Sequence, residues 1–301
     1  MKSKSVKARL LSPIDVITLA FTAWIMVYMA VGYKRVEGFG FHFACYLSIF
    51  VGVILSAYLE RIWVGREGWF YSVFRFLRGL YPVLLFTYFY TSNHSFNRVL
   101  ITTWQDPLFM EADRALFGYL PSLEWGVKYN HWLISELFHF AYFCYYPMIV
   151  GLPVYLWFKD RKAFEELIFV LTFSFYVFYF IYSLLPTIGG RYLDEALIRT
   201  KIYRAGPFTR IMAFIYNYSR HWGGAFPSSH LGITVVLTVA ALSHPRTRKM
   251  GYVFAVISFI MTFSIAYCHY HWFVDAFGGI AVGIGSFYLG RWVYNKMLEN
   301  R

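Results

Sequence analysis

The sequence predicts an all-α polytopic membrane protein, a helix bundle with about eight transmembrane helices. Hydrophobic residues make up 58% of the 301 residues, and the mean hydropathy is +0.47. Both values exceed what the core of a soluble protein needs. Apolar runs of roughly 17 to 25 residues, the length that lets an α-helix cross a bilayer, recur along the chain. We therefore expect a single membrane domain.

Eight apolar stretches account for the expected spans. In chain order they are Ile14 to Val31, Phe39 to Leu59, Trp69 to Thr91, Trp132 to Phe158, Phe164 to Leu185, Ser229 to Ser243, Met250 to Tyr267 and Phe273 to Tyr294. The third is the weakest because Arg75 and Arg78 interrupt it. The first follows a basic segment but is too long for the apolar region of a signal peptide, so residues 1–9 are interpreted as a cytoplasmic tail.

Basic residues predict the orientation, because short cytoplasmic loops retain Lys and Arg. Every second connection is basic. These connections hold Arg61 with Arg66, residues 159–162, residues 244–249, and Lys296 with Arg301. Both termini are therefore expected in the cytoplasm. The loops over residues 91–131 and 186–227 are expected on the opposite face, which is periplasmic, exoplasmic or lumenal.

The net charge of +12 does not predict nucleic-acid binding, since no basic stripe on a soluble module carries it. Cytoplasmic loops that face anionic lipid explain much of it. The outer loop over residues 186–227 is an exception, because it holds six cations where the preference of Lys and Arg for cytoplasmic loops predicts few. They are Arg191, Arg199, Lys201, Arg204, Arg210 and Arg220. Such an excess favours an anionic ligand, although contact with phospholipid headgroups explains it as well.

Two short polar segments in apolar sequence, residues 226–230 and 268–275, lie on the predicted outer face and carry the candidate chemistry. We call them the first and second polar islands. In the second island, His271 and Asp275 are four residues apart and would share one helical face. The carboxylate can then hold the Nδ1–H of the imidazole and leave Nε2 free as a nucleophile. A structural pair, or a metal site that includes His269, would use the same residues. Metal is the weaker interpretation, because His269 and His271 project differently on a helix.

The first island lies where a loop enters a helix, with Pro227, Ser228 and Ser229 at the junction. A helix start leaves several backbone N–H groups unpaired, which makes it suited to bind phosphate. His230, one turn in, would be placed to protonate a leaving group. An ordinary Ser-capped helix with an interfacial histidine is the alternative.

These motifs resemble the type-2 phosphatidate phosphatase superfamily of membrane lipid phosphatases and phosphotransferases. The Pro-Ser-x-His motif stands as residues 227–230, and His-x-x-x-Asp as residues 271–275. The resemblance implies that His271 forms a phosphohistidine, that Asp275 orients it and that His230 is the acid. It implies that Ser228 and Ser229 bind phosphate. It also implies a six-helix core within residues 96–301, after N-terminal transmembrane helices in residues 1–95.

The first motif of the family is altered. Residues 185–192 lack the usual Lys and resemble the Pro-x-x-Gly-Pro-Arg-Tyr form of a divergent bacterial branch, which makes Arg191 the expected phosphate clamp. Ile265 replaces a usual Arg in the third motif, and His269 would supply the missing positive charge.

Two further segments, residues 106–118 and 135–142, resemble the branch that includes the inositol phosphorylceramide synthases. Glu136, His139 and Tyr192 are candidates for an acceptor or lipid site.

The implied function is metal-independent hydrolysis of a lipid phosphate or diphosphate, of the phosphatidate, isoprenyl diphosphate or phosphatidylglycerophosphate type, without a cofactor. Headgroup phosphotransfer of the inositol phosphorylceramide synthase type is the alternative. The expected partners are the lipid substrate and the bilayer, and the sequence carries no signal for an oligomeric state. A transporter or flippase, and an inactive lipid-binding relative, also remain open.

Overall fold

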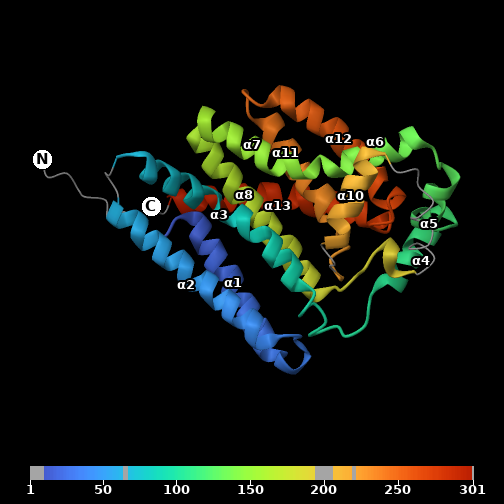
Figure 1. The fold of residues 1–301 in the computed structure, drawn as a ribbon, viewed down its shortest axis with the longest axis horizontal. Helices are drawn as coiled ribbons and strands as arrows, with labels where there is room; N and C mark the ends of the chain where they lie inside the picture. The colour runs from blue at the N-terminus through green and yellow to red at the C-terminus, as the bar shows by residue number, and fades with distance from the viewer. Residues whose placement is uncertain (1–9, 64–66, 194–205, 219–221, 300–301) are drawn as a thin grey trace, which may run out of the picture.

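The computed structural model describes residues 10–63, 67–193, 206–218 and 222–299. This part of the chain is helical and contains no strand, which confirms the predicted all-α class. Figure 1 shows a group of long helices that run side by side. They are α1 (Pro13–Val31), α2 (Phe39–Trp63), α3 (Trp69–Asn93) and α8 (Arg161–Leu184).

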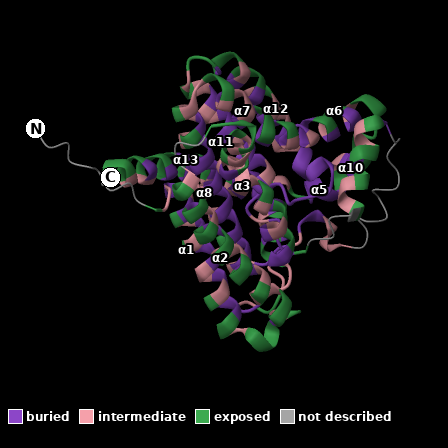
Figure 2. Ribbon diagram, turned by 60° about the vertical axis from the view of Figure 1, so that its left-hand side comes forward, coloured by how far each residue is buried: buried purple, intermediate pink, exposed green. Residues whose placement is uncertain are grey.

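The other long or apolar helices pack on the far side of α8. They are α6 (Trp132–Phe143), α7 (Tyr145–Lys159), α11 (Ser229–Ser243), α12 (Arg248–Tyr267) and α13 (Val274–Glu299). Because α8 contacts α1, α3, α7, α11 and α13, it lies at the centre of the bundle, and it is the most buried of the candidate membrane spans. Figure 2 shows buried residues, in purple, along the middle of the bundle. The outer helices instead expose large apolar side chains, such as Phe70 and Phe259. An outer surface of this kind suits contact with lipid rather than water.

All eight predicted apolar stretches form helices. Five helices in the described residues are long and apolar enough to cross a membrane: α1, α2, α8, α12 and the segment Trp132–Lys159 that α6 and α7 form together. The helix α11 is apolar but has only 15 residues. In α3, Arg78 is buried and pairs with Asp15 of α1 at 2.5 Å, so the interrupting charge is neutralised inside the bundle.

The loops expected in the cytoplasm lie together at one end of the bundle. Arg246 donates to the Lys159 carbonyl, and His244 lies 3.4 Å from the Asp160 carboxylate. Ser12, Arg75, Arg161 and Leu298 line one cavity of about 200 Å³, so both ends of the described chain reach this region. The tail 1–9, Arg66 and Arg301 lie outside the described residues.

Three short helices form at the other end, in segments that the sequence predicts to be loops. They are α4 (Asp106–Phe117), α5 (Pro121–Lys128) and α10 (Pro207–Tyr218). A 3-10 turn, η2 (Gly190–Tyr192), lies beside them, and another, η1 (Tyr33–Arg35), follows α1. Figure 1 shows α4, α5, α6 and α10 grouped at the end of the molecule away from both termini.

Glycines allow α11 and α13 to approach closely next to this end. A Cβ added to Gly283 would lie 2.5 Å from the Gly232 carbonyl oxygen, and one added to Gly279 would lie 2.5 Å from the Ser228 carbonyl oxygen. Backbone contact of this kind requires small residues at the helix crossing. It brings the start of α11, with Ser228, against the first turns of α13, with Asp275.

Candidate active site

His271 lies in the turn between α12 and α13, and its side chain is 5% exposed. Its Nδ1 lies 2.8 Å from the carbonyl oxygen of Ala225 and 3.2 Å from Oδ2 of Asp275. A carbonyl oxygen only accepts hydrogen bonds, so Nδ1 carries the proton. Nε2 is therefore left with its lone pair, and it lies 3.4 Å from the Ser228 Oγ and 3.5 Å from the Tyr142 hydroxyl.

The protein environment keeps this imidazole neutral. Burial lowers the pKa of His271 to about 4, and the neighbouring Arg191 guanidinium also lowers it, whereas the hydrogen bond with the Ala225 carbonyl acts in the opposite direction. At neutral pH the ring is uncharged. An uncharged ring with a free Nε2 has the form that a nucleophile needs.

Arg191 reaches the same place from the turn η2, which follows Gly189. That glycine has a φ of +86°, a conformation that suits glycine and turns the chain toward the site. The Arg191 guanidinium carbon lies 4.0 Å from the centre of the Tyr216 ring and 4.8 Å from that of Tyr270. These two rings are stacked on each other at 4.0 Å. Aromatic faces therefore hold the cation without neutralising it.

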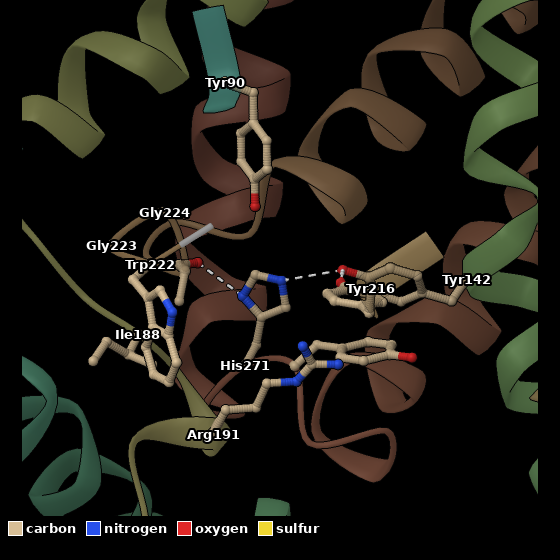
Figure 3. Close-up of a pocket in the computed structure, with 11 residues that line it drawn as sticks. Tyr90, Tyr142, Ile188, Arg191, Tyr216, Trp222, Gly223, Gly224 and His271 are labelled. Atoms are coloured by element: carbon tan, nitrogen blue, oxygen red, sulfur yellow. Dashed lines mark hydrogen bonds between the residues drawn. The ribbon is translucent and has the colours of Figure 1, made fainter. Parts of the chain in front are cut away.

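His271 and Arg191 line one cavity of about 240 Å³. Figure 3 shows both side chains directed into it. The rest of the lining is largely aromatic or backbone: Tyr90, Tyr142, Ile188, Tyr216, Trp222, Gly223, Gly224, Ala225 and Tyr270. A neutral nucleophilic nitrogen, a cation and several hydroxyl groups can together bind and attack a phosphate group.

Ser228 is the N-cap of α11, and the amides of this helix start are mostly engaged within the protein. The Ser228 N–H donates to the Asp275 carbonyl, and the Ser229 N–H donates to the Tyr182 hydroxyl. The Leu231 N–H lies 3.5 Å from the Ser228 Oγ. It is therefore the Ser228 hydroxyl, rather than a row of amides, that faces His271.

His230 and His271 both contact the side chain of Tyr142. The His230 ring stacks on Tyr142 at 4.5 Å and contacts Tyr145 at 4.2 Å, and the centres of the two histidine rings are 6.4 Å apart. The structure thus brings together His271, Asp275, Ser228, Arg191 and His230.

Of these five, His271 and Arg191 line the cavity, and the remaining predicted site residues also lie outside its lining. His269 is fully buried with a φ of +59°, and its Nδ1 contacts the Ser122 carbonyl of α5. The Glu136 carboxylate accepts from the Phe208 and Thr209 N–H groups, so it caps α10.

His139 bonds to the carbonyl of Ser135, one turn earlier, and its ring meets Tyr270 edge-on at 6.5 Å. Tyr192 packs beside the apolar cluster around Trp272. Of the outer-loop cations, Arg210 is exposed on α10, whereas Arg199, Lys201, Arg204 and Arg220 lie outside the described residues. Among the described residues, no three His, Cys, Asp or Glu side chains gather as metal ligands would.

Sequence reasoning missed the tyrosines of the cavity. Tyr142 comes from α6, Tyr216 from α10, Tyr90 from α3 and Tyr270 from the His271 turn. Tyrosine is frequent near the ends of all the spans, where it is typical of interfacial anchoring. Nothing in that pattern distinguishes these four side chains from the rest.

The family model of the PAP2 superfamily matches residues 108–289, which is more than half of the chain. The chain belongs to the PAP2 superfamily. No curated protein and no solved structure matches it. The PAP2 match extends from α4 to α13, so it includes His230, His271 and Asp275 as well as Arg191, whereas α1 to α3 lie outside it. Membership indicates phosphatase-type activity on lipid phosphates, or a related reaction.

Proposed function

We propose that this protein is a metal-independent membrane lipid phosphatase that works through a phosphohistidine at His271. The observation that carries the proposal is the shared cavity: Nε2 of a neutral His271 and the guanidinium of Arg191 face the same space. The substrates we propose are lipid phosphates or diphosphates of the phosphatidate, isoprenyl diphosphate or phosphatidylglycerophosphate type.

In the first half-reaction, His271 Nε2 attacks the phosphorus in line. The N–P bond forms as the P–O bond to the leaving group breaks, and His230, protonated in the complex with the anionic substrate, gives its proton to the departing oxygen. Arg191 and the Ser228 hydroxyl stabilise the phosphoryl oxygens. Asp275 and the Ala225 carbonyl hold the proton on Nδ1, so the nucleophile keeps one orientation.

In the second half-reaction, water attacks the phosphohistidine and the P–N bond breaks. The proton of the water passes to His230, which restores the acid for the next cycle. Inorganic phosphate leaves and His271 returns to its neutral form. The proposal assigns no phosphate contact to His269, because its ring nitrogen is engaged with Ser122.

Headgroup phosphotransfer of the inositol phosphorylceramide synthase type is the second candidate. The support for it is the resemblance of residues 106–118 and 135–142 to that branch, together with the position of Tyr142, which ends the second segment and lines the cavity. In this reaction a lipid or inositol hydroxyl replaces water in the second half-reaction.

The test is phosphate release by the purified protein in detergent, with EDTA present, across the three lipid classes. His271→Ala is compared with His244→Ala, a matched histidine variant at the other end of the bundle. Release that persists in EDTA, survives His244→Ala and is lost in His271→Ala supports the phosphatase. Product that forms only when an alcohol acceptor is added favours the transferase. Loss of activity in EDTA contradicts metal independence.

We also propose that the cavity opens on the periplasmic, exoplasmic or lumenal face, with both termini in the cytoplasm. The support is that the basic connections adjoin Ser12 and Leu298 at the end away from the cavity. Reporter proteins fused to the C-terminus test this. A reporter that is active only outside the cytoplasm should stay silent there, and activity would reverse the orientation.

A further inference from the structure

Two carboxylates on α4 have no role in the mechanism above, yet both are completely buried. Asp106 begins the helix and Asp113 follows seven residues later. Seven residues are close to two helical turns, so the two side chains share one face and are about 10 Å apart along the axis. That face is turned toward the loops that carry Arg191 and His271, as the hydrogen bonds show.

Asp106 connects these two loops directly. Its Oδ1 accepts from the Gly189 N–H at 2.8 Å, and its Oδ2 accepts from the Ile188 N–H at 3.0 Å. The same Oδ1 accepts from the indole Nε1 of Trp272 at 2.9 Å. Gly189 precedes Arg191 by two residues, and Trp272 directly follows His271. One carboxylate thus binds the backbone beside the phosphate clamp and the residue beside the nucleophile.

The two loops also touch each other at this point. A Cβ added to Gly189 would lie 2.4 Å from the Tyr270 carbonyl oxygen and 3.1 Å from the Cα of His271. The backbone of the Arg191 loop is therefore packed against the backbone of the nucleophile loop. A small displacement of either loop changes the separation between the guanidinium and the imidazole.

Asp113 binds the backbone two and three residues after His271. Its Oδ2 accepts from the Phe273 N–H at 2.8 Å, and its Oδ1 accepts from the Val274 N–H at 2.9 Å. These amides lie at the start of α13, where backbone N–H groups have no hydrogen-bond partner within the helix. Asp113 therefore caps α13 from another helix. The residue that follows Val274 is Asp275, which holds His271.

We propose that Asp106 and Asp113 are positioning residues of this reaction: from one face of α4 they hold the Arg191 loop and the His271 loop at a fixed separation. This inference rests on the proposed function. Asp106 sets the position of the clamp relative to the nucleophile, and Asp113 sets the orientation of the His271–Asp275 pair. A displacement of about 1 Å in such a constellation lowers a rate by about a hundredfold.

The variants are Asp106→Asn and Asp113→Asn, which keep size and shape but place an amide donor where a carboxylate oxygen accepted. Glu111→Gln is the matched control, because Glu111 lies on the same helix but is exposed. Trp272→Phe removes only the indole donor to Asp106. All four are made in the full-length protein, and each is checked for its melting temperature.

The first measurement is hydrogen exchange, which does not depend on turnover. Asp106→Asn should speed exchange at residues 188–189, and Asp113→Asn at residues 273–274, with no change in either place for Glu111→Gln. Wild-type exchange at residues 188–189 in Asp106→Asn would overturn the proposal.

The second measurement separates binding from turnover, with orthovanadate as the phosphate probe. We expect Asp106→Asn to lower kcat/KM by about 10-fold to 100-fold and to weaken vanadate binding by a similar factor, because Arg191 is displaced. We expect Asp113→Asn to lower kcat while vanadate affinity stays near the wild-type value. Trp272→Phe should lower kcat by a smaller factor.

A purely structural role predicts something else, namely fewer active molecules with wild-type kcat and vanadate affinity in those that remain. That result would overturn the positioning role. If the wild-type protein turned over no lipid, the proposed function would fail while the exchange and vanadate measurements still tested the two carboxylates.

Discussion

Each end of this bundle holds an arginine next to aromatic rings, Arg78 buried and Arg191 half-buried, and the two charges have different surroundings. At the end near the termini, Arg78 donates to Asp15 at 2.5 Å and its guanidinium lies over the Tyr81 ring. At the other end, Arg191 also lies over tyrosine rings, but no carboxylate in the described part of the chain forms an ion pair with it.

The difference shows how one residue type takes either a structural or a functional role. The charge of Arg78 is neutralised by Asp15, with the Glu60 carboxylate 3.4 Å from its Nε. Asp15 also accepts hydrogen bonds from Tyr81 and from Ser12, which caps α1. This network joins α1 to α3, and although Arg78 also lines the cavity of about 200 Å³ at this end, its charge is already paired with a carboxylate. Arg191 is positioned by rings that leave its charge available, beside a cavity of about 240 Å³ that has room for an anion.

The largest expected effect is on stability, from Arg78→Ala. Removing this partner leaves the Asp15 carboxylate buried without a counter-charge, which should lower the free energy of unfolding by about 3–5 kcal/mol. Phosphoryl transfer per folded molecule should stay at the wild-type level. Thermal unfolding in detergent measures the first and active-site titration the second. The double replacement Asp15→Leu with Arg78→Met should regain much of the stability, and a stable Arg78→Ala variant would contradict this account.

Arg191→Ala should show the opposite pattern. We expect kcat to fall by about 10²-fold to 10³-fold, as when one charge-stabilising donor is removed from a transition state. The melting temperature should change little, because no described carboxylate loses its partner. Steady-state kinetics and thermal unfolding measure the two effects on one preparation. A large loss of stability with normal kcat would show that Arg191 is a second structural cation.

These contrasts mark what the sequence can predict. His271 and Asp275 could be paired from sequence because only four positions of chain separate them, although the predicted helical face is wrong: His271 lies in the turn before α13 and Asp275 in the first turn of that helix, with 3.2 Å between Nδ1 and Oδ2. Helices could be assigned to the apolar stretches for a similar local reason. Arg78 was recognised only as an interruption, since its partner Asp15 lies 63 residues away. The position of His269 depends on a positive φ, which turns its ring to α5 although only one residue separates it from His271.

The tyrosines illustrate the same limit more strongly. Tyr142 and Tyr216 are joined hydroxyl to hydroxyl at 2.8 Å across 74 residues of sequence. Their meeting depends on how α10 packs on α6, and that packing uses the cap that Glu136 provides. No local pattern encodes a contact of this kind.

The pH dependence of the first half-reaction sharpens the comparison at the nucleophile. Because burial lowers the pKa of His271 to about 4, the ring stays neutral and nucleophilic at higher pH. Protonation removes the lone pair of Nε2 only as the pH falls through about 4. We therefore expect the single-turnover rate of phosphohistidine formation to fall as the pH is lowered through about 4, because His271 becomes protonated. Circular dichroism checks that the protein is still folded at each pH. A decrease centred near pH 6.5, the value for an exposed histidine, would mean that the ring is solvated.

The smallest effect expected is that of Tyr142→Phe, which removes one hydroxyl and keeps the ring under His230. That hydroxyl lies 3.5 Å from His271 Nε2 and 2.8 Å from the Tyr216 hydroxyl. A neutral hydrogen bond contributes about 0.5–1.5 kcal/mol, so kcat should fall by a factor of about 2 to 10. Tyr46→Phe, which loses a buried hydroxyl bond to Ser92 outside the cavity lining, is the matched control and should leave kcat unchanged. A Tyr142→Phe effect as large as that of Arg191→Ala would transfer a main catalytic role to the hydroxyl, because the aromatic ring that positions His230 is still present in that variant.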